Sequence, residues 1–407
     1  MRTPLFKLTD NTLNGVSSHR VAIISTHPIQ YYAPLFRTLT ERDRINVRVF
    51  FEWRGAAGEA AYDAGFGQDV EWDIPLLEGY DYTFVENTSN DPGTHHFRGL
   101  VNPDLVPEIE AWQSDAVLIF GWNFQSHLRA LRHFSGKIPI FFRGDSTLLD
   151  EKFGLRMLAR RLFLRWVYRY VDVALYVGQN NKAYFQKHGL DAKQLAWAPH
   201  AIENERFYDE DGIYQQQADA WRKDLGISEE AIVFLFAGKL DTKKAPLLLL
   251  KSFRALETGA VHLIFAGSGP LEADLKQNAT GNKHVHFLGF KNQSKMPVVY
   301  RLGDVFVLPS REETWGLAVN EAMACGRPVI VSDQVGCAPD LVEEGQNGFV
   351  FEAGHADALQ RVMDRLSSTP ERIREMGCRS QEIIQAWSIP KEAECIERAV
   401  QQSKEAS

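Results

Sequence analysis

The sequence predicts an α/β protein built from two Rossmann-like, doubly wound parallel-sheet domains that face each other across a cleft. Three observations predict this fold. The chain has 407 residues, short apolar runs alternate with amphipathic stretches, and a polar, irregular segment (198–226) divides that alternation into two series. Buried strands that alternate with helices form parallel βαβ units. Such sheets bind ligands beyond the carboxyl ends of their strands, so one cleft would hold the ligands of both domains.

The elements follow this alternation along the chain. The first series predicts a helix over 33–40 and strands over 21–25, 47–51, 116–120, 138–142 and 173–177. The second series predicts strands over 231–237, 261–266, 285–288, 305–308 and 329–331. We therefore expect domains at 1–203, of which 1–18 is flexible, and at 204–386, with a final helix at 387–407 that returns to the first domain.

Composition narrows the class of protein. The net charge of −8 argues against nucleic-acid binding, which needs a basic face. The four cysteines form no CxxC pair, so we expect neither a metal site nor a disulfide framework, and a reducing cytoplasm fits best. The first twenty residues do not resemble a secretory signal, and no apolar run approaches the ~18 residues of a membrane span.

The segment 308–332 carries the most informative chemistry. A turn that contains Glu313 joins a strand to a helix expected over 317–324. The free N–H groups at such a helix start can hold a diphosphate. Glu321, one turn into the helix, could accept hydrogen bonds from a ribose, and Glu313 could reach a bound sugar; alternatively, both are solvated acids near a helix start. The residues expected at the diphosphate are Thr314, Trp315, Gly316 and Leu317.

This segment closely resembles the Glu-x7-Glu signature of retaining GT-B glycosyltransferases of family four. The resemblance covers nearly the whole chain and is strongest over 231–354. It implies that Glu321 binds the nucleotide ribose and that Glu313 contacts the donor sugar. It further implies retaining transfer from a nucleotide-sugar donor, which is a substrate and not a cofactor, to a hydroxyl of a glycan or lipid-linked acceptor in glycoconjugate synthesis.

Two further motifs match the same family. In 236–245 the sequence Gly-Lys-Leu places Lys239 where relatives carry arginine, and Lys244 matches the family lysine. The resemblance implies that both cations hold the donor diphosphate, which would need no metal; the alternative is a solvated basic loop. Phe290 and Lys291 follow a run that resembles the base-binding loop. The Gly-x-Gly-Pro at 267–270 is expected to form a tight strand-to-helix turn.

The first domain departs from the family pattern. His27 and Gln30 stand where many relatives carry glycines, and Trp122 stands where relatives often carry histidine. His200 replaces an asparagine of the family's interdomain motif. We expect these four residues to contact the sugar or acceptor, although His27 could equally cap the chain. Asp145, after a predicted strand, is a candidate catalytic contact or a turn-shaping residue.

A basic amphipathic helix is expected over 152–170. Its arginines could rest on anionic lipid at the inner face of the membrane, or its apolar stripe could join the core. The acidic run 209–211 is expected to be solvated charge. Two other functions stay open: a sugar-nucleotide epimerase on the same fold, and a non-catalytic sugar-nucleotide-binding subunit.

Overall fold

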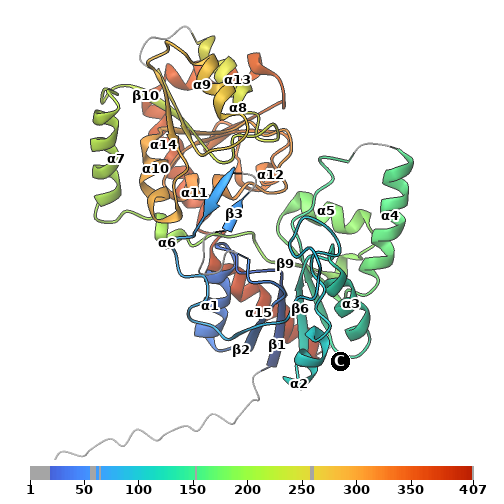
Figure 1. Ribbon diagram of the computed structural model, residues 1–407. Helices are drawn as coiled ribbons and strands as arrows, with labels where there is room; N and C mark the ends of the chain where they lie inside the picture. The colour runs from blue at the N-terminus through green and yellow to red at the C-terminus, as the bar shows by residue number, and fades with distance from the viewer. Residues whose placement is uncertain (1–18, 56–60, 64–65, 152–153, 257–260, 406–407) are drawn as a thin grey trace, which may run out of the picture.

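The computed structural model describes residues 19–55, 61–63, 66–151, 154–256 and 261–405, so the terminus 1–18 that was expected to be flexible lies outside the described residues. It contains two parallel sheets with helices on their faces, one in each half of the molecule (Figure 1). This arrangement confirms the α/β fold with two Rossmann-like domains. The sequence predicts it because buried strands and amphipathic helices alternate in both halves.

The first sheet has seven parallel strands in the order β5-β2-β1-β6-β7-β8-β9. Alternate residues of its interior strand β1 enter two different apolar clusters, because successive side chains point to opposite faces and helices cover both faces. The strands are β1 (His19–Ser25), β2 (Ile45–Phe51), β5 (Tyr82–Phe84), β6 (Ala116–Phe120), β7 (Ile140–Arg143), β8 (Val173–Tyr176) and β9 (Leu195–Trp197). The α-helices are α1 (Ala33–Arg42), α2 (Leu105–Ala111), α3 (Gln125–Phe134), α4 (Leu155–Tyr168) and α5 (Gln179–Lys187).

The second sheet has six parallel strands in the order β12-β11-β10-β13-β14-β15. Its strands are β10 (Ile232–Ala237), β11 (Val261–Ala266), β12 (Val285–Gly289), β13 (Val305–Leu308), β14 (Val329–Ser332) and β15 (Gly348–Phe351). The helices around it are α8 (Pro246–Arg254), α9 (Glu272–Asn278), α10 (Met296–Leu302), α11 (Leu317–Ala324), α12 (Ala338–Leu341), α13 (Ala356–Ser367) and α14 (Pro370–Ile384). The order reverses between β10 and β13, which is where doubly wound sheets bind ligands.

The expectation of an irregular segment over 198–226 is wrong. The segment contains α6 (Asn204–Phe207) and α7 (Ile213–Asp224), whose polar residues hide the helical pattern. Asp209 was expected to be solvated, but its side chain is largely buried. Its carboxylate accepts the N–H groups of Tyr214 and Gln215 at 3.0 and 2.8 Å and lies 3.4 Å from the Arg301 guanidinium. The carboxylate therefore holds the first turn of α7.

The last helix, α15 (Ile389–Glu405), lies against α1 of the first domain (Figure 1). Glu392 on α15 forms a buried ion pair of 2.6 Å with Arg143 at the end of β7. Arg143 also donates to the carbonyl groups of Ala198 and Pro199, in the segment that leads to the second domain. None of the described helices is both long and apolar enough to cross a bilayer.

Candidate active site

A cavity of about 360 Å³ lies between the carboxyl ends of the two sheets, and we call it the interdomain cavity. The structure brings most of the sequence-predicted site residues to its lining. His27 and Trp122 are the two that it places elsewhere. The predicted residues that line it are Gln30, Asp145, His200, Lys239, Lys244, Phe290, Lys291, Glu313, Thr314, Trp315, Gly316, Leu317 and Glu321.

Glu321 lies on α11 and is buried at the base of this cavity. The Tyr300 hydroxyl donates to one of its carboxylate oxygens at 2.6 Å, and the Tyr31 hydroxyl donates to the other at 3.3 Å. Burial raises the pKa of Glu321. An ionised carboxylate has about four acceptor positions, so it can still accept hydrogen bonds from a ligand. The Tyr31 contact joins the two domains, because Tyr31 precedes α1.

The turn before α11 carries a carboxylate and approaches a lysine from another loop. Glu313 and Lys244 form an ion pair that is largely shielded from solvent. Burial lowers the pKa of Lys244 to about 8, although the negative charge of Asp241 acts in the opposite direction and raises that pKa. Gly316 begins α11 with a φ of 101°, a left-handed conformation that favours glycine, and no side chain caps the helix there. The helix start thus presents its backbone N–H groups beside a lysine.

The Gly-x-Gly turn after β11 lets two loops of the second domain approach closely. A Cβ atom on Gly267 would lie 1.9 Å from the carbonyl oxygen of Gly238, and the φ of Gly267 is 140°. Only glycine fits such an approach of two backbones. Gly238 and Gly267 both line the interdomain cavity. The turn therefore shapes the part of the lining next to Lys239.

The first domain forms the opposite wall of the cavity. The Thr314 hydroxyl donates to the Asp145 carboxylate at 2.8 Å, which joins the two walls. His200 is buried with its ring centroid 5.8 Å from that of Trp315. Burial lowers the pKa of His200 to about 3, and the Arg143 charge acts in the same direction, so its imidazole is neutral at physiological pH.

Sequence reasoning missed four aromatic residues of the lining. Tyr31 and Tyr300 contact Glu321, as described above. Phe66 and Trp72 belong to the segment around the small antiparallel pair β3 (Ala61–Asp63) and β4 (Gln68–Val70). The Phe66 ring meets that of Phe290 edge-on at 4.9 Å, and its carbonyl accepts the Ser268 hydroxyl at 2.9 Å. No local motif marks these aromatics, which reach the cavity only through the tertiary fold.

The two remaining predicted residues have other surroundings. His27 Nδ1 lies 2.9 Å from the Thr26 hydroxyl, and its ring packs edge-on against Trp53. Burial lowers the pKa of His27 to about 4. Trp122 lines a separate cavity of about 320 Å³, the side cavity, which shares Asp145 with the interdomain cavity.

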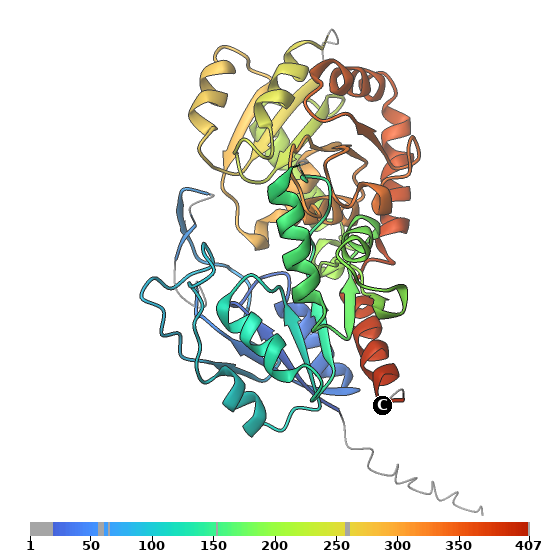
Figure 2. The ribbon, with the colours of Figure 1, turned by 90° about the vertical axis from the view of Figure 1, so that its right-hand side faces the viewer.

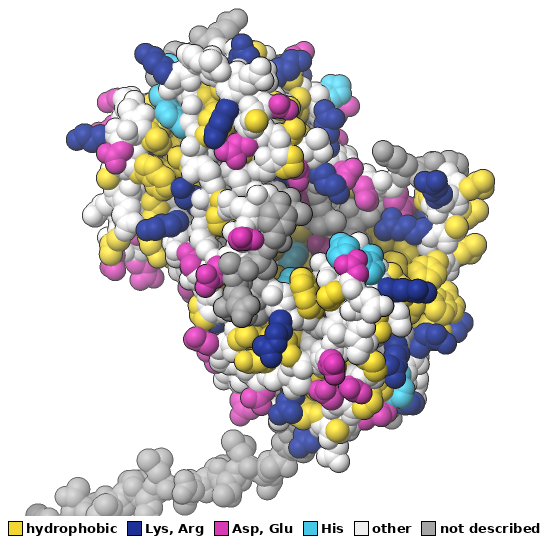
Figure 3. All heavy atoms as spheres, in the orientation of Figure 1, with side chains coloured by type: hydrophobic (Ala, Val, Ile, Leu, Met, Phe, Trp, Pro, Cys, Tyr) yellow, Lys and Arg dark blue, Asp and Glu magenta, His cyan; other side chains and the backbone are white. Residues whose placement is uncertain are grey.

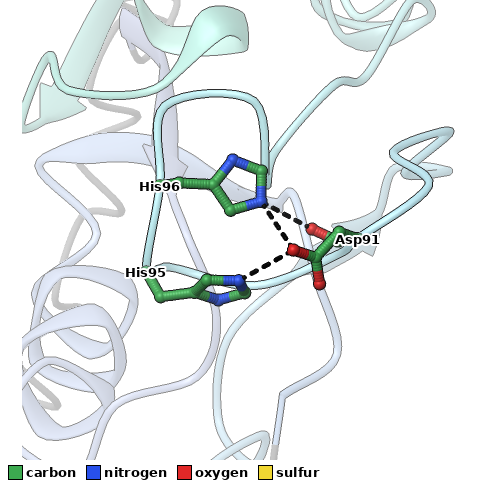
Figure 4. Close-up of side chains that lie close together, drawn as sticks. All are labelled: Asp91, His95 and His96. Atoms are coloured by element: carbon green, nitrogen blue, oxygen red, sulfur yellow. Dashed lines mark hydrogen bonds and ion pairs between the residues drawn. The ribbon is translucent and has the colours of Figure 1, made fainter.

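Asp91, His95 and His96 form a group of potential metal ligands on a loop of the first domain (Figure 4). Both histidine Nε2 atoms lie within 3.2 Å of the Asp91 carboxylate. His96 Nδ1 accepts the N–H of Arg98 at 3.2 Å, so in the neutral ring Nε2 carries the proton. A histidine that binds metal through Nε2 instead donates through its other nitrogen. The arrangement shown is that of a hydrogen-bonded loop, and it does not line the interdomain cavity.

Comparison with known proteins identifies the class of the second domain. Residues 217–382 match the family described as glycosyl transferases group 1. The D-inositol 3-phosphate glycosyltransferase of Geodermatophilus obscurus is 33% identical over 196 residues, which are 44% of this chain and 42% of that protein. The sulfoquinovosyl transferase SQD2 of Arabidopsis thaliana is 28% identical over 270 residues, 63% of this chain and 50% of that protein. The chain spans about half the length of these curated relatives.

The fold of the whole chain is similar to that of solved GT-B glycosyltransferases. HepE of Anabaena, in complex with UDP and glucose, superposes with a TM-score of 0.71 at 19% identity over 94% of this chain and 100% of that chain. Sucrose-phosphate synthase of Thermosynechococcus elongatus gives 0.71 at 19% identity over 96% and 100%. The chain therefore carries a glycosyl transferases group 1 domain within a GT-B fold.

Proposed function

We propose that this protein is a retaining glycosyltransferase of family four that moves a sugar from a nucleotide-sugar donor to an acceptor hydroxyl. One observation carries the proposal: two lysines, the start of α11 and two glutamates from separate motifs of the second domain line one cavity. Cations and free N–H groups suit a diphosphate, and a buried carboxylate suits a ribose. The UDP and glucose bound to HepE, a protein of the same fold, support a donor of this class.

The donor would lie on the second domain. Glu321 would accept hydrogen bonds from the ribose, and the aromatic Phe290 with Lys291 would border the base. Lys239, Lys244 and the N–H groups of 314–317 would hold the diphosphate. Glu313, which pairs with Lys244, would orient the sugar next to the departing diphosphate.

Transfer requires that negative charge grow on the diphosphate as the glycosidic bond breaks. Two fixed cations and a helix start stabilise that charge without reorganising, and they are the reason we propose a metal-independent reaction. The acceptor hydroxyl would attack from the same face, which gives retention. Asp145 borders both the interdomain cavity and the side cavity, and it would contact the acceptor or the transferred sugar. No carboxylate is assigned as a covalent nucleophile.

The acceptor would approach from the first domain, where Gln30, Asp145 and His200 face the donor wall. Its class is a glycan or a lipid-linked molecule. We place the protein in the cytoplasm, in contact with the inner face of the membrane. All four cysteines are free, which suits a reducing compartment.

The test is turnover of UDP-, GDP- and ADP-sugars by the purified protein, with and without a chelator. We expect at least one donor to release its nucleotide and to transfer or lose its sugar, with the chelator having no effect. The anomeric configuration of the product, read by NMR, should equal that of the donor. A donor that binds but is never turned over would contradict the proposal and favour a non-catalytic subunit, and a rearranged nucleotide sugar would favour an epimerase.

A further inference from the structure

Helix α4 has an apolar face that points away from the protein. Leu155, Leu158 and Leu162 are 87%, 54% and 62% exposed, and they follow one another at intervals of three and four residues, so they share one side of the helix. We call this side the leucine face. Single exposed leucines are ordinary on the surface of a soluble protein. Three on one face of a helix form an apolar patch, which is typical of an interaction surface.

The leucine face is not the side of α4 that joins the core. Leu164, Val167 and Tyr168 are the buried residues of the helix, and they pack into the apolar cluster of the first domain. Leu164 follows Leu162 by two residues, which places it on the opposite side of the helix. The helix is therefore apolar on two sides. Packing of an apolar stripe into the core accounts for the side with Leu164, Val167 and Tyr168, but not for the leucine face.

The charges on α4 identify the partner. The helix and its C-cap residue carry five arginines and no acidic residue, in a chain whose net charge is −8. Figure 3 shows hydrophobic and basic side chains side by side at this edge of the molecule, and Figure 2 shows α4 along the face turned to the viewer. Arg165 and Arg169 follow Leu162 by three and seven residues and so share its side of the helix. Arg161 instead pairs with Glu151 at 2.8 Å, and Arg160 lines the side cavity. Arginines beside an exposed apolar face fit the phosphate groups and acyl boundary of an anionic bilayer. The five residues are Arg156, Arg160, Arg161, Arg165 and Arg169.

The same helix borders the side cavity. Arg160 lines that cavity together with Trp122 and Asp145. Phe163, which is 40% exposed beside the leucine face, packs edge-on against the Trp122 ring at 5.4 Å. The Phe163–Trp122 contact therefore connects α4, beside the leucine face, with a cavity that shares Asp145 with the proposed donor site.

We propose that α4 docks this protein onto an anionic lipid bilayer through the leucine face and its arginines. The docking itself is independent of the proposed function. Its consequence for the substrate rests on that function: the acceptor is an amphipathic molecule anchored in the bilayer, whose polar head enters the side cavity beside Arg160.

The docking is tested by co-sedimentation of the full-length protein with vesicles. We expect binding to vesicles of phosphatidylcholine with phosphatidylglycerol, weak binding to phosphatidylcholine alone, and loss of binding as salt rises. The triple variant Leu155→Ser, Leu158→Ser, Leu162→Ser should lower the partition constant by about tenfold or more. Ile213→Ser is the matched control, because Ile213 is 52% exposed on α7 of the other domain, and it should bind as the wild type does.

Two measurements separate the possible failures. Thermal stabilisation by UDP, GDP or ADP should be the same in the triple variant and the wild type, so a loss of vesicle binding with intact nucleotide binding supports docking alone. Equal vesicle binding by the triple variant and the wild type would overturn the proposal. Sedimentation velocity that shows a wild-type dimer abolished in the triple variant would also overturn it, because a second copy would then cover the leucine face.

Discussion

The two walls of the interdomain cavity are built in different ways. The second domain supplies its wall largely from the loops after β10, β11, β12 and β13, and Gly267 and Gly269 make close backbone approaches there. The first domain supplies its wall from residues far apart in the chain, among them Tyr31, Phe66, Asp145 and His200. The second-domain wall could therefore be predicted largely from local motifs, whereas the first-domain wall also needs residues such as Phe66 that only the folded chain brings to the cavity.

This difference suggests a division of labour. The second-domain wall has the cations and the buried carboxylate that suit a nucleoside diphosphate. The first-domain wall has a neutral histidine, aromatic rings and one carboxylate, which suit a polar acceptor. If the division holds, changes in the second domain lower donor affinity, and changes in the first domain lower turnover with donor affinity preserved.

The largest expected effect is on the second-domain wall itself. Gly267→Ala should lower the free energy of unfolding by about 3 kcal/mol or more, because the added Cβ meets the Gly238 carbonyl and the backbone is left-handed. Gly281→Ala is the control. Its φ is 81°, but no atom lies within 4 Å of the added Cβ, so the cost should be roughly 1–2 kcal/mol. Thermal or denaturant unfolding measures both, and equal losses would contradict the close approach.

Lys244→Gln should weaken nucleoside diphosphate binding by about 1.5–3 kcal/mol, because a charged hydrogen-bond donor is lost from a shielded site. Lys243→Gln is the matched control: Lys243 is exposed and pairs with Glu312 at 3.0 Å, so its loss should cost about 0–1 kcal/mol. Calorimetric titration with UDP, GDP or ADP measures the difference. An equal effect of both changes would mean that the loop acts only through its overall charge.

Asp145→Ala should lower turnover at least about tenfold while leaving donor affinity nearly unchanged, as expected for a positioned acid–base or substrate contact. Thr314→Val removes the donor of the interdomain hydrogen bond that Asp145 accepts, which is worth about 1 kcal/mol. The backbone N–H of residue 314 is kept. The ratio of the two kcat values separates a chemical role from domain closure. Equal losses of kcat in the two variants would show that Asp145 acts only by holding the two domains together.

The smallest expected effect concerns pH. The folded-state pKa of His200 is lowered to about 3 from 6.5, so its contribution to stability is present above pH 6.5 and is lost as pH falls toward 3. His200→Asn should therefore reduce the drop in Tm between pH 7 and pH 5.5 by about 2 °C, because the linked free energy over that range is roughly 1 kcal/mol. The same drop in the variant and the wild type would show that His200 titrates normally.

Much of the fold could be predicted because apolar runs mark buried strands. The strands over 116–120, 261–266 and 305–308 match β6, β11 and β13. Helix α7 was missed because its sequence is mostly polar, and β5 and β9 are only three residues long. The pair β3–β4 carries no apolar alternation to mark it.

The site shows the same limit. Glu313, Lys244 and the start of α11 could be predicted as neighbours because parallel strands bring their carboxyl ends to one edge. Tyr300 could not, because it lies in an apolar helical stretch and resembles a core residue until its hydroxyl is seen to reach Glu321. Trp122 was assigned to the cleft by its place after β6, and the structure turns it toward α4 instead.

The central claim is that the second domain binds a nucleoside diphosphate through Glu321. Calorimetric titration of the wild type, Glu321→Gln and Asp145→Ala with UDP, GDP and ADP tests it most directly. We expect at least one nucleotide to bind the wild type and Asp145→Ala alike, and to bind Glu321→Gln at least about tenfold more weakly. Wild-type protein that binds none of the three, or Glu321→Gln that binds as tightly as the wild type, would contradict the claim.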